Sequence, residues 1–166
     1  MALIVHVRGD GVSLDHVTSL LRVHVGDAIV GLPATVVREI ARAVTITALP
    51  GAPQIIEGAV NVRGQVVPVV DVRRRLAMPA KDLDPDEFLV VFLAGSRTLA
   101  FRADDIDDLV DIDPDALETS AALSPALHGL AGLAAREDGV LVIYDPEAFV
   151  SQGEAQALDA ALLAHQ

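Results

Sequence analysis

The acidic segment from Asp104 to Asp115 is the part of the sequence whose residue types come closest to a metal site. Its final five residues, Asp-Ile-Asp-Pro-Asp, alternate acidic side chains as the start of a calcium-binding loop does. Such a loop needs glycine at position six and glutamate at position twelve, but Ala116 and Ala122 stand there. The pattern therefore favours an exposed edge strand that its charges protect from aggregation.

Other patterns that carry chemistry are weak or missing. The sequence has no cysteine, so it offers no disulfide, thiolate ligand or cysteine nucleophile. Its five histidines form no His-Glu-x-x-His motif, and the glycine motifs of nucleotide-binding loops and serine hydrolases do not occur. Ser13, Asp15 and His16 are a poor nucleophilic group because all three lie in one short segment. We expect no catalytic residue, no metal ion and no cofactor.

Two charged residues, Glu39 and Arg63, lie in apolar stretches where a charge needs a reason. Arg63 and Gly64 separate two valine-rich segments, as the turn of a β-hairpin does. An arginine at a hairpin tip can make planar, bidentate contacts with a protein partner. The alternatives are a structural ion pair or an arginine whose stem covers apolar surface. The sequence alone leaves these interpretations open.

The elements that must position these residues are mostly strands, because β-branched residues recur in short runs between turns. Residues 13–18 are compatible with a helical turn or an approach to the next strand, and residues 36–40 with an extended or half-helical segment. Pro68 donates no backbone hydrogen bond, which places its strand at a sheet edge or at a bulge. The predicted strands are residues 1–8, 20–25, 28–32, 44–47, 59–62, 66–72, 88–93, 98–103, 104–113, 127–134 and 140–144.

Two helix starts carry capping signals. Asp71 precedes the short basic turn 73–75 and is suited to cap it. Ser151 and Glu154 form a capping box at the start of a C-terminal helix. Ala155, Leu158 and Leu162 then share one face of that helix, which we expect to dock onto the rest of the protein.

Composition bounds the class of protein. With 166 residues and 52% hydrophobic residues, the chain is long enough to bury one sizeable core or two small ones. A net charge of −12 and 3% aromatic residues argue against a nucleic-acid partner. No apolar run approaches the roughly 20 residues that span a bilayer, and the first seven residues lack the basic start of a signal peptide. We expect a cytoplasmic protein without direct membrane insertion.

The two halves of the sequence echo each other weakly. Ile56-Glu57-Gly58 opens a strand that a Gly64 turn follows, and Leu127-His128-Gly129 opens one that a Gly139 turn follows. Residues 77–87 between the halves are polar, contain two prolines and are the best candidate linker. The repetition predicts two similar β-units packed together.

Several of these strings, taken in order, resemble the CheW-like domain over about residues 20–150. The central string is specific because proline, glycine, arginine and aspartate occur in a fixed order. Weaker matches are ADDI at 103–106 and the segment from Gly129 to Asp145. The matching strings of the first half are VREI at 37–40, ITALPGAP at 46–53, IEG at 56–58 and NVRGQVVPVVDVR at 61–73.

The resemblance implies an all-β fold of two SH3-like five-stranded β-barrel subdomains packed together, with a few short helices and a C-terminal helix. Within a single domain over 1–166, the first subdomain would span about residues 20–80, the second 88–150 and the helical tail 151–166. Three alanines depart from the family's common residues. Ala48 stands where proline is frequent, Ala77 where glycine is frequent and Ala103 in place of a valine.

The resemblance also implies an adaptor and not an enzyme. Members of this family couple chemoreceptors to a CheA-type histidine kinase, by binding the cytoplasmic tip of the receptor and the regulatory domain of the kinase. A cytoplasmic protein of this kind is recruited to membrane receptor arrays. The family positions linked to partner contacts or their support are matched by Val37, Glu39, Gly58, Arg63 and Gly64.

Those five positions have distinct implied roles. Glu39 and Arg63 would form a polar pair near the partner surface, with Val37 in an apolar contact. Gly58 would allow close backbone approach, and Gly64 would allow the turn.

Two rival functions remain open at this point. One is a CheW-like interaction module that serves another partner in a divergent chemosensory or motility pathway. The other is a small metal-dependent hydrolase that uses the acids of residues 104–115.

Overall fold

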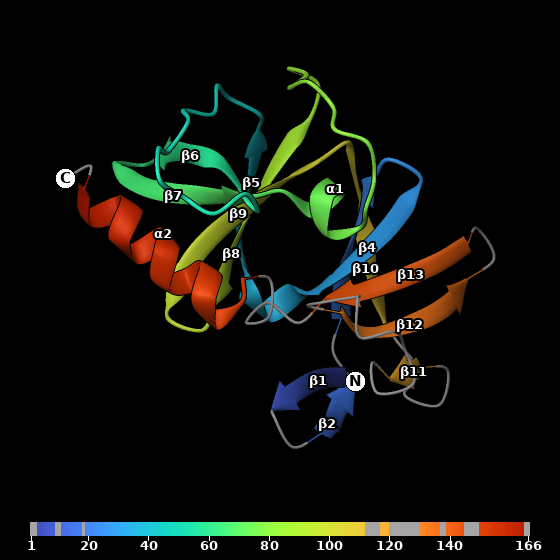
Figure 1. The fold of residues 1–166 in the computed structure, drawn as a ribbon. Helices are drawn as coiled ribbons and strands as arrows, with labels where there is room; N and C mark the ends of the chain where they lie inside the picture. Colours follow the sequence, from blue (N-terminus) through green and yellow to red (C-terminus); the bar gives the residue numbers. More distant parts are fainter. Residues whose placement is uncertain are drawn as a thin grey trace.

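The computed structural model describes residues 3–8, 11–17, 19–111, 117–119, 130–136, 139–144 and 150–164. The fold is all-β, with two large sheets, two short helical turns and a C-terminal helix (Figure 1). These features confirm the expected fold class.

One large sheet has six strands and the other has five. In spatial order, the six strands are β10 (Asp105–Asp111), β3 (Ser19–Val25), β4 (Ala28–Pro33), β13 (Gly139–Tyr144), β12 (Leu130–Arg136) and β11 (Leu117–Thr119). The five are β5 (Val37–Arg42), β8 (Phe88–Ala94), β9 (Arg97–Ala103), β7 (Gln65–Val70) and β6 (Ile56–Val62). A separate hairpin joins β1 (Leu3–Arg8) to β2 (Gly11–Val17). The helical elements are η1 (Ala34–Val36), α1 (Val72–Arg75) and α2 (Gln152–Ala164).

Each large sheet takes strands from both halves of the sequence. The six-stranded sheet combines β3 and β4 with β10 to β13, and the five-stranded sheet combines β5, β6 and β7 with β8 and β9. The division into subdomains at about 20–80 and 88–150 stays a prediction. The strand order shows that each large sheet pairs strands from both of these ranges.

The central strand β8 of the five-stranded sheet is buried on both faces. Along β8, Val90 and Phe92 belong to the main core, which includes residues of β3, β4 and α2, whereas Leu89 and Val91 belong to a smaller core with β6 and β7. Phe92 packs edge-to-face on Phe101, with ring centroids 5.8 Å apart. Burial on two sides explains why β8 is a continuous apolar run.

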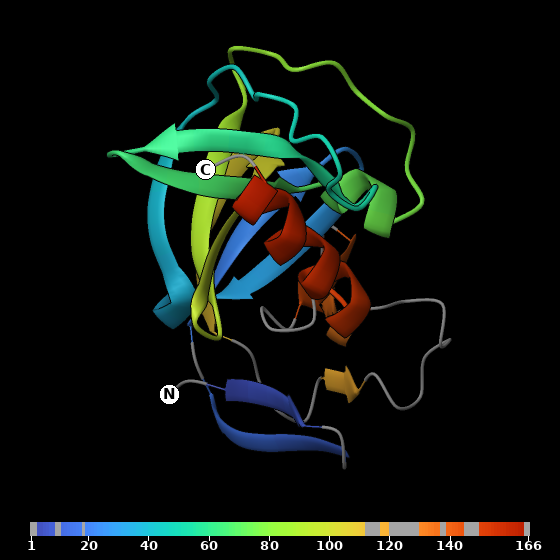
Figure 2. The same ribbon diagram turned by 60° about the vertical axis from the view of Figure 1, so that its left-hand side comes forward.

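Helix α2 lies against this core, as Figure 2 shows. The predicted capping box is present: the amide of Ser151 donates to Glu154 Oε1 at 2.8 Å, and the amide of Glu154 donates to Ser151 Oγ at 3.2 Å. Leu158 is fully buried in the main core. Arg97 in β9 holds the helix through Asp159 at 2.6 Å. The expected docking of the helix is therefore confirmed.

Two local predictions need correction. Residues 44–47 form no strand, and Thr47 makes an isolated bridge to Ala59 instead. Pro68 lies in an inner strand and not at a sheet edge, since β7 has neighbours on both sides. The parallel pairing of β7 with β9 covers only Val69 and Val70, so Pro68 is not required as a donor there. The register shift in this hairpin lies between Ile56 and Gly58 of β6.

The two segments for which the sequence left two conformations open are mostly strands. Residues 11–17 form β2, and β5 begins at Val37 after the short turn η1. The predicted edge strand of residues 104–113 is confirmed as β10, which ends the order of the six-stranded sheet. The end of the predicted strand 104–113 and the start of the predicted strand 127–134 lie outside the described residues, which omit 112–116 and 120–129.

Ala77 takes a conformation that favours glycine. It follows α1 with a φ of +55°, and its amide donates to the carbonyl of Arg74 at 3.1 Å. The resemblance places glycine at this position. An alanine in the left-handed region is strained because its Cβ crowds the backbone.

We expect Ala77→Gly to raise the free energy of unfolding by about 0.5–1 kcal/mol, because relief of strain exceeds the entropy that glycine adds to the unfolded chain. Urea denaturation measures the change. Ala80→Gly is the matched control, since Ala80 lies in the same exposed segment without a positive φ. It should lower stability. A loss of stability in both variants contradicts the strain at Ala77.

Candidate functional site

Glu39 and Arg63 meet across the surface of the five-stranded sheet. Arg63 Nε lies 3.3 Å from Glu39 Oε2, and Arg63 Nη2 donates to Glu39 Oε1 at 3.3 Å. The guanidinium therefore faces both carboxylate oxygens in the fork-like arrangement that arginine favours. We call this pair the clasp.

The clasp joins the two opposite edges of one sheet. Glu39 lies in β5, which is the first strand in the spatial order, and Arg63 lies in the turn that follows β6, which is the last. The sheet must therefore curl until the hairpin tip reaches β5. In Figure 2 the tip of the β6–β7 hairpin lies close to β5.

The turn that carries Arg63 is a two-residue hairpin turn with both central residues at positive φ. Arg63 has a φ of +52° and Gly64 one of +85°, the combination typical of a type I′ turn. Asn61 Oδ1 accepts a hydrogen bond from the amide of Gly64 at 2.8 Å. The expected turn-forming role of Gly64 fits this geometry, because glycine reaches positive φ without strain.

The clasp is too exposed to account for much stability. The side chain of Arg63 is 83% exposed and that of Glu39 is 28% exposed. Ion pairs of this kind contribute about 0–1 kcal/mol. An arginine at positive φ costs about 1–3 kcal/mol relative to a relaxed backbone. The strain at Arg63 is thus at least as large as the gain from its ion pair, which argues against a purely structural role.

The two other predicted residues take no part in this ion pair. Val37 is partly buried and packs against the main core. Gly58 lies under the segment that crosses β6, where an added Cβ would come within 2.3 Å of the carbonyl oxygen of Thr47. The expectation of close backbone approach at Gly58 agrees with this contact.

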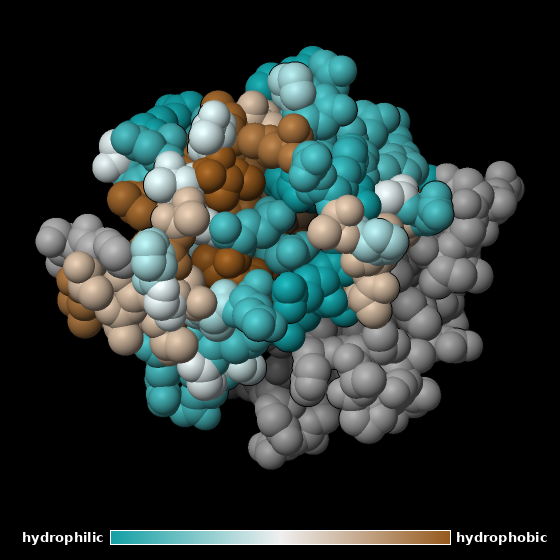
Figure 3. All heavy atoms as spheres, turned by 45° about the horizontal axis from the view of Figure 1, so that its top comes forward, coloured by the Kyte–Doolittle hydropathy of each residue, from teal (hydrophilic) through white to brown (hydrophobic). Residues whose placement is uncertain are grey.

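An apolar pocket of about 300 Å³ lies beside Gly58, between the segment at residues 47–50 and the outer face of the β6–β7 hairpin. Val66 lines it and is 60% exposed. Hydrophobic surface gathers on the left half of Figure 3, among hydrophilic side chains. The other lining residues are Thr47, Ala48, Leu49, Pro50, Ala59, Val60 and Asn61.

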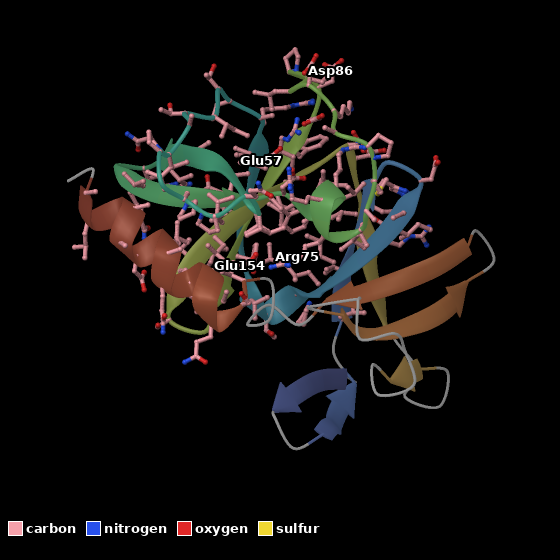
Figure 4. All side chains as sticks on the ribbon, in the orientation of Figure 1. Glu57, Arg75, Asp86 and Glu154 are labelled. Carbon is pink, nitrogen blue, oxygen red and sulfur yellow. The ribbon has the colours of Figure 1, made fainter. Side chains whose placement is uncertain are left out.

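A second group of charges is buried and was not anticipated from the sequence. Arg102 in β9 donates to both carboxylate oxygens of Glu57, at 2.8 and 3.1 Å, and to Glu87 at 3.2 Å. Glu87 is only 3% exposed. Lys81 reaches Glu87 at 3.1 Å and Asp104 at 2.5 Å. Figure 4 shows Glu57 near the centre of the molecule.

We call the group of Glu57, Lys81, Glu87, Arg102 and Asp104 the charge cluster. It connects segment 77–87 to both sheets. The carbonyl of Lys81 accepts from Arg102 at 2.7 Å, and Asp104 accepts from Arg73 Nη2 at 2.6 Å and from the amide of Gly26 at 2.5 Å. A charge inside the apolar strand 98–103 was the signal for Arg102, the same signal that singled out Glu39. Removing one partner of such a buried group leaves an uncompensated charge.

The cluster shifts the pKa values of its members. Burial raises the pKa of Glu57, and hydrogen bonds from Arg102 offset part of the rise. Burial also opposes ionisation of Asp104, but the hydrogen bonds from Lys81 and the amide of Gly26 outweigh it and lower the pKa of Asp104. The same hydrogen bond from Lys81 to Asp104, with that to Glu87, raises the pKa of Lys81.

Two of the acids suspected of binding metal, Asp104 and Asp107, are paired with basic side chains, whereas the side chains of residues 111–115 lie outside the described part of the structure. Asp104 binds Arg73 and Lys81, and Asp107 lies 3.1 Å from Arg22 and 3.3 Å from His24. Within the described ranges, no three histidine or acidic side chains are arranged to hold a metal ion. Within the same ranges, no helix is long and apolar enough to span a membrane.

Comparison with known proteins gives one consistent family. Residues 19–154 match the CheW-like domain family. The chain is 26% identical over 137 residues to the chemotaxis protein CheW of Klebsiella aerogenes, which covers 81% of this chain and 82% of that protein. It is 36% identical over 103 residues to the protein FrzA of Myxococcus xanthus, covering 59% and 64%. The crystal structure of the scaffolding protein TtCheW from Thermoanaerobacter tengcongensis shares the fold, with a TM-score of 0.68, 22% identity and coverage of 76% and 88%.

The lowered pKa of Asp104 predicts a pH-dependent contribution to stability. The folded-state pKa lies below the unfolded one, so the contribution is complete above about pH 4 and is lost as the pH falls through the folded pKa. Asp104→Asn removes it at every pH. We expect the variant to be less stable than the wild type by about 1–2 kcal/mol at pH 7, and the difference to shrink below pH 4.

Urea denaturation at pH 7 and at several values below pH 4 measures this difference. Asp82→Asn is the control, because Asp82 is exposed in the same connecting segment. A difference between Asp104→Asn and wild type that stays constant down to pH 3 contradicts the role of Asp104 in the cluster.

Proposed function

This chain belongs to the CheW-like domain family, and on that premise we propose that it is a non-enzymatic adaptor that couples chemoreceptors to a CheA-type histidine kinase. Its partners are the cytoplasmic tip of a chemoreceptor and the regulatory domain of the kinase. It acts in the cytoplasm and reaches the membrane by recruitment to receptor arrays. The names of its relatives, a chemotaxis protein and a scaffolding protein, support this function.

The strained, exposed conformation of Arg63 is the observation that carries the proposed binding site. Arg63 is at a φ of +52° at the tip of a hairpin. Its exposed ion pair with Glu39 adds too little stability to offset the strain of this conformation. What the clasp does provide is a guanidinium fixed in direction and open to solvent. An oriented arginine loses less conformational entropy when a partner binds.

The remaining predicted residues support this surface in different ways. Gly64 permits the turn, and Gly58 permits the crossing segment to lie on β6. Val37 precedes Glu39 in β5 and packs against the main core, so its role is to fix that strand in place with a partial contribution to the partner surface. Arg63 and Glu39 make the direct polar contacts.

A second candidate is an adaptor in a divergent motility pathway with a different kinase or regulator. The similarity to FrzA, a relative whose name is not that of a chemotaxis protein, supports a partner set other than the usual one. The same clasp would serve, with a different partner. A metal-dependent hydrolase has less support, since Asp104 and Asp107 contact arginine, lysine and histidine side chains.

We expect Arg63→Glu to weaken binding to the kinase regulatory domain or to the receptor tip by about 2 kcal/mol, roughly thirtyfold, because a central interface arginine is replaced by a repulsive charge. Isothermal titration calorimetry with each partner measures the loss. Circular dichroism should show an unchanged fold, since the clasp adds little stability.

Arg74→Glu is the matched control for charge. Arg74 is exposed, contacts only the neutral side chain of Gln54, and lies in α1 away from the clasp. It should leave both affinities nearly unchanged. Binding that survives Arg63→Glu would move the site to another surface. Absence of binding by the wild-type protein to any such kinase or receptor would overturn the adaptor function.

A further inference from the structure

The arginines of β5 differ from most of the other described basic residues in what they contact. Carboxylates are in contact with Arg22, Arg63, Arg73, Arg75, Lys81, Arg97 and Arg102. By contrast, Arg38 donates to the carbonyl of Thr35 at 3.3 Å, and Arg42 to the carbonyl of Asp86 at 3.3 Å. In a chain with 24 acidic and 12 basic residues, carboxylates are in excess. Among the described residues Arg74, whose side chain donates to Gln54, also lacks a carboxylate, but Arg38 and Arg42 lie together on one strand.

These arginines flank an exposed apolar residue on the same strand. Side chains alternate between partly buried and exposed along β5, and the exposed set is Arg38, Ile40 and Arg42. Ile40 is 41% exposed. We call these three residues the basic stripe. It lies on the opposite face of β5 from Glu39, so it is distinct from the clasp.

Strand β5 has an available edge beside the stripe. It pairs only with β8 among the described strands and ends the order of its sheet. Figure 2 shows β5 at the left-hand side of the molecule, with the tip of the β6–β7 hairpin close to its upper part and no strand of the same sheet paired along its outer edge. Such an edge presents backbone donors and acceptors on which an extended segment can pair.

The arginines are partly ordered in advance. The guanidinium of Arg42 lies over the ring of Phe88, 4.6 Å from its centroid, and also bonds to a carbonyl. A guanidinium has five N–H donors, so these contacts leave donors for a carboxylate. A partly ordered arginine loses less entropy when it binds one.

We propose that the basic stripe and the outer edge of β5 bind an extended acidic segment of a partner protein. Its carboxylates alternate with an apolar residue at positions i, i+2 and i+4. Charge complementarity selects this occupant, because two arginines without carboxylates flank an isoleucine. The spacing follows from strand geometry: same-face side chains recur every second residue on both paired strands.

The proposal goes beyond the adaptor function and does not depend on it. The test therefore uses neither a receptor nor a kinase. The probe is the peptide Thr-Glu-Thr-Val-Thr-Glu-Thr, whose glutamates and valine share one face of a strand. The control peptide Thr-Glu-Thr-Val-Glu-Thr-Thr has the same composition but places its glutamates on opposite faces.

Titration into the ¹⁵N-labelled full chain, followed by amide chemical shifts, measures affinity and location together. We expect saturable shifts at the amides of residues 38–42 with the first peptide, and weaker binding of the control peptide. Added salt should weaken the binding, because the arginines are exposed. Equal affinity for the two peptides, no binding, or shifts confined to other strands would overturn the proposal.

Substitution of both arginines tests their part directly. Arg38→Gln with Arg42→Gln should raise the dissociation constant by roughly twofold to thirtyfold, the loss expected for two exposed ion pairs. Arg38→Gln alone, which leaves the stacking on Phe88 intact, should give a smaller increase. Arg74→Gln is the matched control and should bind as the wild type does.

Edge arginines also protect sheets from aggregation. If that is their entire role, the double variant will self-associate in sedimentation velocity while peptide affinity stays unchanged. This outcome would also overturn the proposal. Circular dichroism of each variant excludes unfolding as the cause of a loss.

Discussion

Burial of the central strands of the five-stranded sheet on both faces is the constraint on which the rest of the structure depends. Its strands place one set of side chains in the main core and the alternate set in the smaller core. The buried central strands offer little surface to a partner, so polar, exposed groups gather at the edge strand β5 and at the hairpin tip. The clasp and the basic stripe both lie there, on opposite sides of β5.

The charged residues fall into two sets. The buried set stabilises the fold, and the exposed set can contact a partner. Arg102, Glu57 and Glu87 are largely buried and connect strands that are distant in sequence, so loss of one member leaves a desolvated charge. Arg63 is mostly exposed, and its ion pair adds little to folding. The difference in exposure, not the presence of an ion pair, separates structural from interaction residues here.

Local features of the sequence were the most predictable. The hairpin turn at Arg63-Gly64, the capping box at Ser151 and the edge position of β10 each depend on residues close in the chain. Strand order was not predictable, because pairing of β7 with β9 and of β4 with β13 joins segments far apart. The residue pattern predicted the clasp only as two separate charges in apolar stretches, and the family resemblance implied that they form a polar pair. Their meeting required the curl of the sheet, which no local pattern contains.

A double-mutant cycle between Glu39 and Arg63 tests most directly the claim that the clasp serves binding and not folding. Wild type, both alanine single variants and the double variant are compared for urea denaturation and for affinity to the kinase regulatory domain. We predict a coupling of at most about 1 kcal/mol in folding, with each single variant binding at least roughly tenfold more weakly. Strong coupling in folding together with unchanged affinity would contradict the claim and make the clasp a structural ion pair.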